Sequence, residues 1–292
     1  MITVVALNYN DYQTMISYID SIVDYSNINY IVVVDNLSTD DSYDKLKSYY
    51  GRSQKVVVIS TAYNGGYGYG NNFGIRYAIE RFESEFILIT NSDVHYGEAT
   101  LGALENMMLS RQDIGVVAPR MLDSSGNKTI NCAWKIPNSK EFVRALIGNR
   151  NKLNLSYNYR NNDLYKYVDC VPGSLLLIRS KAFQDIQGYD EGIFLFAEET
   201  VLGIRLKKKE WKTILLLSNT FVHDHSVSIN KTYKSKKKTD LLMWKSRKYI
   251  LKKYYGFNEL KLNIIGVVVR LKIEASAFKH GPWLNLKKGI TG

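Results

Sequence analysis

Two acidic groups, far apart in this sequence, carry the residue types that group-transfer chemistry needs. Asp93 closes a polar triplet at residues 91–93 that directly follows the apolar run at residues 86–90, and Glu198 stands next to Glu199. A carboxylate at the end of a buried strand, such as that of Asp93, costs little free energy only where it contacts water, a cation or a hydroxyl-rich ligand. A metal site for a nucleotide diphosphate is one interpretation, and an ordinary turn is the other, because Asn, Ser and Asp all favour turns.

The adjacent acids Glu198 and Glu199 precede a helical pattern that includes Leu202 and Leu206. One of the two acids could accept the proton of a hydroxyl group, which is too weakly acidic to react unaided at neutral pH. The alternative is a structural role, because negative charge at a helix N-terminus is stabilised by the helix dipole. The residues alone leave both interpretations open.

Two of the four histidines, His223 and His225, stand close together near the end of the main apolar pattern. Residues at this spacing in an extended chain point to opposite faces, so only one of the two is expected to reach a shared cleft. A solvated loop is the alternative interpretation.

Strand and helix patterns alternate along the first part of the chain. Apolar runs bounded by polar residues predict buried strands, and apolar residues at the helical period predict helices between them. Such alternation with short connections indicates parallel βαβ units wound into one sheet. The predicted strands cover residues 3–7, 30–34, 55–59 and 86–90, and the helices cover residues 13–23, 43–50 and a stretch through 75–79.

Polar residues follow three of these strands, and the carboxyl ends of parallel strands meet at one edge of a sheet. A nucleotide bound there would find hydrogen-bond acceptors for its base and ribose at Asp35 and a divalent cation at Asp93. The side chains expected at this edge are Asn8, Asn10, Asp35, Asn36, Asn91 and Asp93.

The glycine-rich segment at residues 64–72 is not a dinucleotide-binding loop. That motif would need glycine at position 73, where Phe73 stands, and it follows the first strand of its sheet, whereas this segment follows the third. We interpret the segment as a flexible turn at which the backbone passes close to a ligand or a helix.

The later part of the chain is less regular. Residues 119–167 lack a clear period, and a long insertion of this kind is usually functional or mobile. Trp134 in this insertion is expected to cover a core edge, with sugar stacking as the alternative. Further predicted elements are a helix near residues 100–109, strands at 114–118, 168–178 and 212–217, and a helix from residue 198; Gly173 marks a close approach.

Length and composition narrow the class of protein. With 292 residues, 45% of them hydrophobic, the chain suffices for one large globular domain with an appendage. The two cysteines, Cys132 and Cys170, form neither a disulfide framework nor a metal knuckle, which favours a reducing cytoplasm. The N-terminus lacks a basic region and no apolar run has the length of a membrane span, so we expect neither a signal peptide nor a transmembrane helix.

Positive charge is concentrated in the last part of the chain. Residues 231–292 hold 16 Lys and Arg against three Asp and Glu, so we predict a main domain at residues 1–230 and a basic helical segment at residues 231–292. A polybasic segment favours an anionic membrane surface or nucleic acid. This segment contains a helical apolar stripe that could pack on the body or dock onto an anionic bilayer. The stripe comprises Ile264, Val267, Val268, Leu271, Ala275 and Phe278.

Four blocks of this sequence resemble the family-2 inverting glycosyltransferases of GT-A fold, especially the branch of rhamnosyl- and galactofuranosyltransferases. The blocks occur at residues 5–10, 33–40, 64–72 and 91–94, and the last resembles that family's DxD element in its Asn-x-Asp form. Ser92 stands where the family commonly has proline. The resemblance implies an α/β protein of GT-A fold, with a single mainly parallel sheet flanked by helices.

A fifth block, at residues 188–205, resembles the family's Gly-Phe-Asp-Glu…Glu-Asp-x-Asp-Leu-x-x-Arg region, whose second acid is the general base. Counted back from Arg205, that acid is Glu199. Val201 occupies the position of the family's next Asp, which is a departure. The resemblance also implies that a histidine completes the metal site, and His223 aligns better than His225.

The resemblance implies an enzyme that moves a sugar from a nucleotide-diphosphate donor, dTDP-rhamnose or a UDP-hexose, to a hydroxyl of a glycan or polyprenyl-linked acceptor. Its product would belong to a cell-surface polysaccharide such as O-antigen or capsule. Mg²⁺ or Mn²⁺ would be held by Asp93 and His223, and the catalytic acids would be Glu199 and Glu198. The residues implied in donor binding are Asn8, Asn10, Asp35, Asn36, Asn64, Gly65, Asn71, Asn91 and Asp93.

We expect the protein in the cytoplasm, with peripheral association with the inner face of the cell membrane and no nucleic acid as partner. A sugar nucleotidyltransferase would share the sheet but normally has a Gly-rich loop bearing Lys or Arg after the first strand, unlike residues 8–11. A non-catalytic nucleotide-binding module would explain the polar sheet edge but not the second acid block.

Overall fold

The computed structural model describes residues 1–129, 132–147, 155–160, 162–224 and 235–279. The chain divides into two compact units. Unit 1 comprises Met1–Ile136 and Leu155–Val227, and unit 2 comprises Pro137–Asn154 and Ser228–Gly292.

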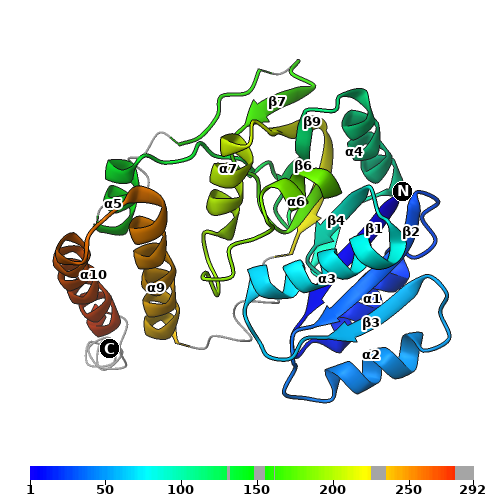
Figure 1. Cartoon of the computed structure of the whole chain (residues 1–292), viewed down its shortest axis with the longest axis horizontal. Coiled ribbons are helices and arrows are strands. Elements are labelled where there is room, and N and C mark those ends of the chain that lie inside the picture. The colour runs from blue at the N-terminus through cyan, green and yellow to red at the C-terminus, as the bar shows by residue number, and fades with distance from the viewer. Residues whose placement is uncertain (130–131, 148–154, 161, 225–234, 280–292) are drawn as a thin grey trace, which may run out of the picture. The chain divides into compact units, whose positions relative to one another are not determined.

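Unit 1 is an α/β structure with helices flanking one open sheet (Figure 1). Its first part alternates strand and helix as predicted. The elements of this part are β1 (Ile2–Asn8), α1 (Tyr12–Ile22), β2 (Ile28–Asp35), α2 (Ser42–Tyr50), β3 (Val56–Ser60), α3 (Tyr67–Phe82) and β4 (Phe86–Thr90). The later elements are β5 (Val94–His95), α4 (Glu98–Ser110), β6 (Ile114–Leu122), β7 (Tyr165–Val168), β8 (Leu175–Arg179), α6 (Ser180–Asp185), α7 (Glu198–Lys208) and β9 (Lys212–His223).

The strands follow the order β3-β2-β1-β4-β8-β6-β9-β5, and β7 pairs with β9. The first four are parallel, which places Asn8 opposite Asp35 and Ala6 opposite Thr90. From β8 onward the sheet is mixed, because β8 runs antiparallel to both β4 and β6. The single open sheet is confirmed, while the parallel arrangement is continuous only through its N-terminal half.

Two predicted segments differ from the structure. The expected strand at residues 168–178 is two strands, because β7 ends at Val168 and β8 begins at Leu175. Pro172 and Gly173 lie between them, and neither residue type favours the interior of a strand. The insertion at residues 119–167 is not wholly irregular, since it contains α5 (Ser139–Ile147), the end of β6 and most of β7.

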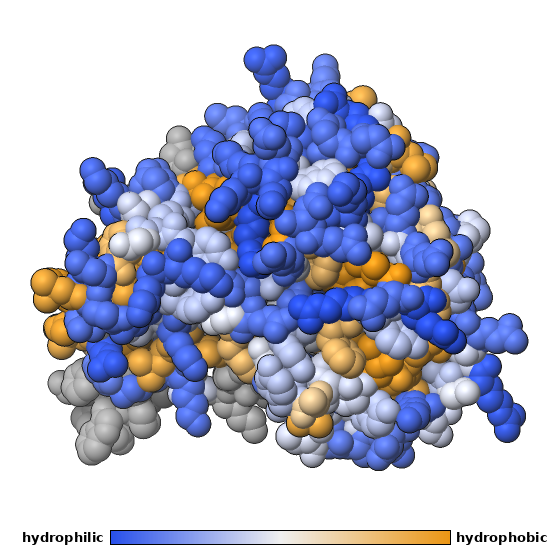
Figure 2. All heavy atoms as spheres, viewed as in Figure 1, coloured by the Kyte–Doolittle hydropathy of each residue, from blue (hydrophilic) through white to orange (hydrophobic). Residues whose placement is uncertain are grey.

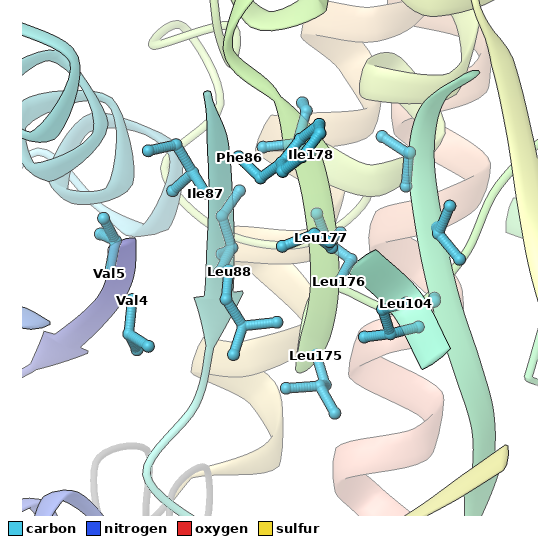
Figure 3. Packing of buried hydrophobic residues seen from close by; sticks show 14 of the residues in the cluster. Val4, Val5, Phe86, Ile87, Leu88, Leu104, Leu175, Leu176, Leu177 and Ile178 are labelled. Atoms are coloured by element: carbon cyan, nitrogen blue, oxygen red, sulfur yellow. The ribbon is translucent and has the colours of Figure 1, made fainter. Parts of the chain in front are cut away.

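The core of unit 1 lies on both faces of the central strands. Every residue of β4 and of β8 is buried, as the predicted two-sided burial of residues 86–90 requires. Figure 3 shows Phe86, Ile87 and Leu88 beside the side chains of β8, with Leu104 of α4 nearby. Burying one such aliphatic or aromatic side chain contributes about 1.5–3 kcal/mol, so these strands are a rigid base for the residues that follow them.

Two glycines let α3 approach the sheet closely. A Cβ atom on Gly74 would lie 2.5 Å from a methyl carbon of Val34, and one on Gly70 would lie 2.3 Å from a methyl carbon of Leu7. Gly68 and Gly70 of the 64–72 segment therefore belong to a helix packed on β1 and β2.

Unit 2 consists of α5, α9 (Lys236–Tyr255) and α10 (Glu259–Lys279). Tyr255 closes the connection between α9 and the α5 region, because its hydroxyl donates to Pro137 O at 2.6 Å and its ring packs on Phe142. The C-terminal helices thus share a unit with residues 137–154, which the sequence did not group with them. Among the described residues, no helix has both the length and the apolar content that crossing a bilayer demands.

Candidate active site

The first cluster of predicted site residues joins the carboxyl ends of β1 and β2. Asn8 Nδ2 donates to Asp35 Oδ2 at 2.9 Å, and the backbone N–H of Ser38 donates to Asp35 Oδ1 at 2.8 Å. Ser38 Oγ also donates to Asp35 Oδ2, at 2.7 Å. Asp35 and Asn8 are both buried. The carboxylate of Asp35 therefore fixes its own loop, and its role toward a nucleotide stays a prediction.

Asn10 adopts the left-handed conformation that Asn tolerates better than most residues, with φ of 56°. Its side chain accepts from the backbone N–H of Thr39 at 2.7 Å and donates to Thr39 Oγ1 at 3.0 Å. The turn after β1 and the loop after β2 are thus held together at an exposed edge of unit 1.

Asn36 connects the end of β2 to the glycine-rich segment. Its Nδ2 atom donates to Asn64 Oδ1 at 3.0 Å and to Gly66 O at 3.2 Å, while its Oδ1 accepts from Thr61 Oγ1 at 3.1 Å. Asn36 is buried, and both ends of its amide are used within the protein. Its observed contacts are those of a residue that positions the neighbouring loops.

The turn before α3 requires glycine at two positions. Gly66 has φ of +89°, and a Cβ there would lie 2.0 Å from Phe194 O. A Cβ on Gly65 would lie 2.4 Å from the ring of Tyr69. The backbone N–H of Tyr67 donates to Phe194 O at 3.0 Å, so the turn contacts the loop that precedes α7. The predicted close backbone approach is present, and it is made to this loop.

Asn71 and Asn91 differ in what they contact. Asn71 is buried in α3, where its Nδ2 atom donates to Tyr67 O at 3.0 Å. Asn91 directly follows β4, and its backbone N–H donates to Ser174 O at 2.9 Å. Asn91 therefore lies at the sheet edge predicted for the donor, whereas Asn71 uses its Nδ2 atom for a hydrogen bond within its own helix.

Asp93 and His223 meet although they follow different strands. His223 Nε2 lies 3.2 Å from Asp93 Oδ1, and both side chains are largely buried. Strand pairing produces this contact, because Val94 of β5 is the register partner of His223 at the end of β9. The backbone N–H of Asp224 also donates to Asp93 O at 2.9 Å. The structure thus brings together the two residues predicted as metal ligands, whereas His225 lies outside the described residues.

The donor set of Asp93 and His223 fits a divalent cation that shares its remaining ligands with a substrate. A carboxylate oxygen and an imidazole nitrogen suit Mn²⁺, and Mg²⁺ is often held by one or two carboxylates plus substrate phosphates. Across the described residues, no set of three or more His, Cys, Asp or Glu side chains forms a complete metal site. A cation here would therefore depend on ligands from a bound nucleotide or water.

Glu198 and Glu199 open α7, as the sequence predicted. The preceding residues Phe196 and Ala197 both adopt left-handed conformations, with φ of 76° and 70°. Two successive non-glycine residues in this region store backbone strain. The surrounding structure therefore holds the start of α7, and with it the two acids, in a specific position.

Residues 173–174 connect the acid pair to the end of β4. The backbone N–H of Gly173 donates to Glu199 Oε1 at 3.4 Å, and Ser174 O accepts from the backbone N–H of Asn91. Glu199 thus reaches the start of β8, which pairs with β4 just before Asn91 and Asp93. The two acid blocks lie around the same end of the sheet.

Burial and mutual repulsion keep the acid pair hard to ionise. Burial and, to a smaller extent, the neighbouring Glu199 together raise the pKa of Glu198 to about 8. Burial also raises the pKa of Glu199, while the N–H of Gly173 opposes that rise by donating to the carboxylate. Because both pKa values are raised, either acid is a stronger base when ionised than an exposed carboxylate is.

Tyr67 and Asn72 also contact this candidate site, and neither was among the residues predicted from the sequence. Tyr67 Oη donates to Gly173 O at 2.7 Å, and a Cβ on Gly173 would lie 2.9 Å from that hydroxyl. Asn72 anchors the loop before α7 by accepting from the N–H of Tyr189 and donating to Tyr189 O. Their position in the 64–72 block was a usable signal, because a turn requires glycine but does not require the polar and aromatic side chains that this block also contains.

Trp134 is held in place by contacts within unit 1. Its Nε1 atom donates to Thr200 Oγ1 at 3.1 Å, and its backbone pairs with Cys170. Val201, which stands where the resembling family has Asp, is buried in α7. The side chain at this departure from the family's pattern therefore lies in the protein interior.

The family model described as glycosyl transferase family 2 matches residues 3–187. The chain is 27% identical over 205 residues to the N-acetylglucosaminyl-diphospho-decaprenol L-rhamnosyltransferase of Mycobacterium tuberculosis, covering 66% of each chain. It is 24% identical over 214 residues to the low-salt glycan biosynthesis hexosyltransferase Agl10 of Haloferax volcanii, covering 71% of this chain and 62% of that relative. The match thus spans just under two thirds of the relatives' own length.

A solved structure of similar fold is GalNAc-T7 with UDP, GalNAc and Mn²⁺. It superposes with a TM-score of 0.62 at 14% identity, covering 77% of this chain and 44% of that one. Identity this low supports a statement about the fold alone, which is that of the GT-A glycosyltransferases.

Proposed function

This chain belongs to glycosyl transferase family 2, and from that premise we propose that it is a metal-dependent inverting glycosyltransferase. The donor is a nucleotide-diphospho-sugar, dTDP-rhamnose or a UDP-hexose. The acceptor is a hydroxyl group of a glycan or of a polyprenyl-linked saccharide in cell-surface polysaccharide synthesis. The rhamnosyltransferase and hexosyltransferase relatives support these substrate classes.

One observation carries the proposal. The neighbouring residues Gly173 and Ser174 hydrogen-bond Glu199 on one side and Asn91 on the other. A general base must lie near the acceptor hydroxyl, while the leaving diphosphate needs positive charge nearby. This link supports a single cleft in which Glu199 and Asp93 serve these two needs.

In the proposed reaction Glu199 removes the proton of the acceptor hydroxyl as its oxygen attacks the anomeric carbon. The new carbon–oxygen bond forms while the bond from that carbon to the diphosphate oxygen breaks, so the configuration inverts. The nucleoside diphosphate leaves with the electron pair. The raised pKa of Glu199 suits it to take up this proton near neutral pH.

Other residues hold the donor in this proposal. Asp93 and His223 would hold Mg²⁺ or Mn²⁺, which when bound neutralises charge on the leaving diphosphate. Asn8, Asn10 and Asp35 line the end of the sheet where the nucleoside would lie. A polyprenyl-linked acceptor is anchored in a bilayer. In this proposal the enzyme therefore acts in the cytoplasm, at the inner face of the cell membrane.

The test pairs a transfer assay with a binding assay. Wild-type protein and Glu199→Gln are incubated with dTDP-rhamnose or UDP-hexoses, Mn²⁺ or Mg²⁺, and a polyprenyl-diphosphate-linked N-acetylglucosamine acceptor. We expect Glu199→Gln to lose transfer by about a thousandfold or more while the donor still raises its melting temperature.

The matched control is Glu80→Gln, which changes an exposed acid on α3 and should transfer at the wild-type rate. Wild-type turnover in Glu199→Gln would overturn the assignment of the base. A wild-type protein that binds nucleotide sugars but transfers to no acceptor would favour the non-catalytic nucleotide-binding module.

A further inference from the structure

The helix α10 is apolar on two opposite faces. One face packs inside unit 2, where Leu262, Val269 and Ile273 are buried. A Cβ on Gly266 would lie 3.2 Å from the ring of Trp244, so this face lies close against α9. The buried face is not the stripe that the sequence analysis singled out.

The opposite, exposed face contains most of the predicted stripe, and Leu260 extends it by one turn. Leu260, Ile264, Val267 and Leu271 are 70%, 61%, 60% and 65% exposed, and Val268 is 41% exposed. Phe278 lies outside the described side chains. The spacing of these residues keeps them on one side of a helix with 3.6 residues per turn. Figure 2 shows hydrophobic surface in the area that Figure 1 labels α10.

A contiguous exposed apolar stripe of this kind marks an interaction surface. The five residues of the stripe span three turns of α10, and no other described residue buries them. A helix that is apolar on both sides is expected to be covered on both sides. We therefore expect another molecule or surface to cover the exposed face of α10.

The positive charge around the stripe indicates which kind of surface covers it. Residues 236–279 hold 12 Lys and Arg against three Asp and Glu. At 100° per residue, Lys261 and Lys272 lie along one edge of the stripe and Arg270 lies beyond the other, and all three are exposed. All three acids of these helices already pair with Lys residues, in Lys236–Asp240, Lys237–Glu274 and Lys252–Glu259.

We propose that α10 docks onto an anionic bilayer surface, lying in the plane of the interface with Leu260, Ile264, Val267, Val268 and Leu271 among the acyl chains. Helices that bind in this way combine an apolar face with Lys and Arg beside it. Each such cation near an anionic surface adds about 1 kcal/mol of attraction. A second copy of this chain would bring the same net positive charge to the interface and is disfavoured.

This inference rests on the proposed function only for its purpose, which is to bring the active site to a lipid-linked acceptor. The docking itself needs neither donor nor catalysis. Vesicle binding can therefore fail while transfer to a soluble acceptor succeeds, and the reverse also holds.

The test is co-sedimentation of the full chain with phosphatidylcholine vesicles that contain or lack phosphatidylglycerol. The double variant Ile264→Asn/Leu271→Gln removes apolar contacts from exposed positions, so its melting temperature should stay unchanged. We expect the wild type to bind the anionic vesicles and the double variant to bind them about tenfold or more weakly. The matched control is Leu109→Gln, which alters a 57% exposed leucine on α4 and should bind as the wild type does.

A second variant tests the charge. Lys261→Gln/Lys272→Gln should weaken binding to anionic vesicles about tenfold and leave the weaker binding to neutral vesicles unchanged. Wild-type protein that does not sediment with anionic vesicles would overturn the proposal. Equal binding by the wild type and Ile264→Asn/Leu271→Gln would do the same. So would a dimer in sedimentation velocity that this variant dissociates, since the face would then join two copies.

Discussion

His223 Nε2 lies 3.2 Å from Asp93 Oδ1 at the point where β5 and β9 pair. The antiparallel register sets this contact, because Val94 faces His223 across the ladder and Asp93 precedes Val94. A turn residue chosen only for its local propensity would not need a buried imidazole beside it. The pairing therefore favours the metal-ligand interpretation of Asp93 over the simple turn.

Loss of either residue of this pair should remove the metal dependence of donor binding. We expect Asp93→Asn and His223→Asn to weaken donor binding in Mn²⁺ about tenfold or more, and to leave the weaker metal-free binding unchanged. Titration calorimetry with and without Mn²⁺ measures both quantities. His95→Asn is the matched control, because His95 is exposed on the neighbouring strand β5. Unaltered Mn²⁺ dependence in Asp93→Asn would exclude this residue as a ligand.

The acid pair should make folding stability fall as the pH rises. The pKa of Glu198 is raised by burial to about 8 in the folded protein, above its ordinary value of 4.5. The folded state therefore favours the protonated form. The contribution of this group is fully present below pH 4.5 and is lost progressively as the pH rises through about 8.

Glu198→Gln removes this titration. As the pH rises from 5 to 9, we expect the free energy of unfolding of the variant to increase relative to that of the wild type. Urea unfolding at several pH values measures this difference. Glu80→Gln, at an exposed position on α3, should follow the wild-type pH dependence. If the free energy of unfolding of Glu198→Gln has the same pH dependence as that of the wild type over this range, Glu198 does not have a raised pKa.

The sequence predicts the first half of the sheet well because its signals are local. Apolar runs end in polar residues at Asn8, Asp35 and Asn91, and short connections leave only parallel pairing. The pairing of β8 with β4 has no such signal, since it depends on contacts far apart in the chain. Pro172 and Gly173, inside the apolar run at residues 168–178, were a usable sign of the break between β7 and β8.

The sequence indicated the acids and the histidine of the candidate site but not the contacts that hold them. Asp35 and Asn36 can be selected by position at a strand end, yet their observed partners come from loops. For α10, the sequence contains two apolar stripes, and periodicity cannot tell which one packs. The packing of Gly266 on Trp244 decides it, and such a contact is invisible in a helical pattern.

Gly66 and Gly102 should respond to alanine in opposite ways. Gly66 has φ of +89°, and a Cβ there would lie 2.0 Å from Phe194 O, so Gly66→Ala should destabilise the fold by about 2 kcal/mol or more. Gly102 lies within α4, where a Cβ would meet only Asn27 Nδ2 at 3.8 Å. Gly102→Ala should stabilise by about 0.5–1 kcal/mol through helix propensity. Urea denaturation of both variants measures the difference, and a destabilised Gly102→Ala would contradict the geometry described for α4.

Tyr67 should act as a positioning residue for Glu199. Its hydroxyl donates to Gly173 O at 2.7 Å, and Gly173 N–H in turn donates to Glu199 Oε1. Tyr67→Phe removes the first of these hydrogen bonds and loosens the second. Because a single hydrogen bond contributes about 0.5–1.5 kcal/mol, we expect kcat to fall about threefold to tenfold with the donor KM unchanged.

The pH profile separates this role from a merely structural one. The N–H of Gly173 opposes the rise in the pKa of Glu199, so a weaker contact in Tyr67→Phe should raise that pKa further. The acid limb of the kcat profile should then move to higher pH, since Glu199 must be ionised to accept the proton. Tyr77→Phe, whose ring packs on Phe82, is the control that should leave the limb in place. A reduced kcat with an unmoved acid limb would assign Tyr67 to packing alone.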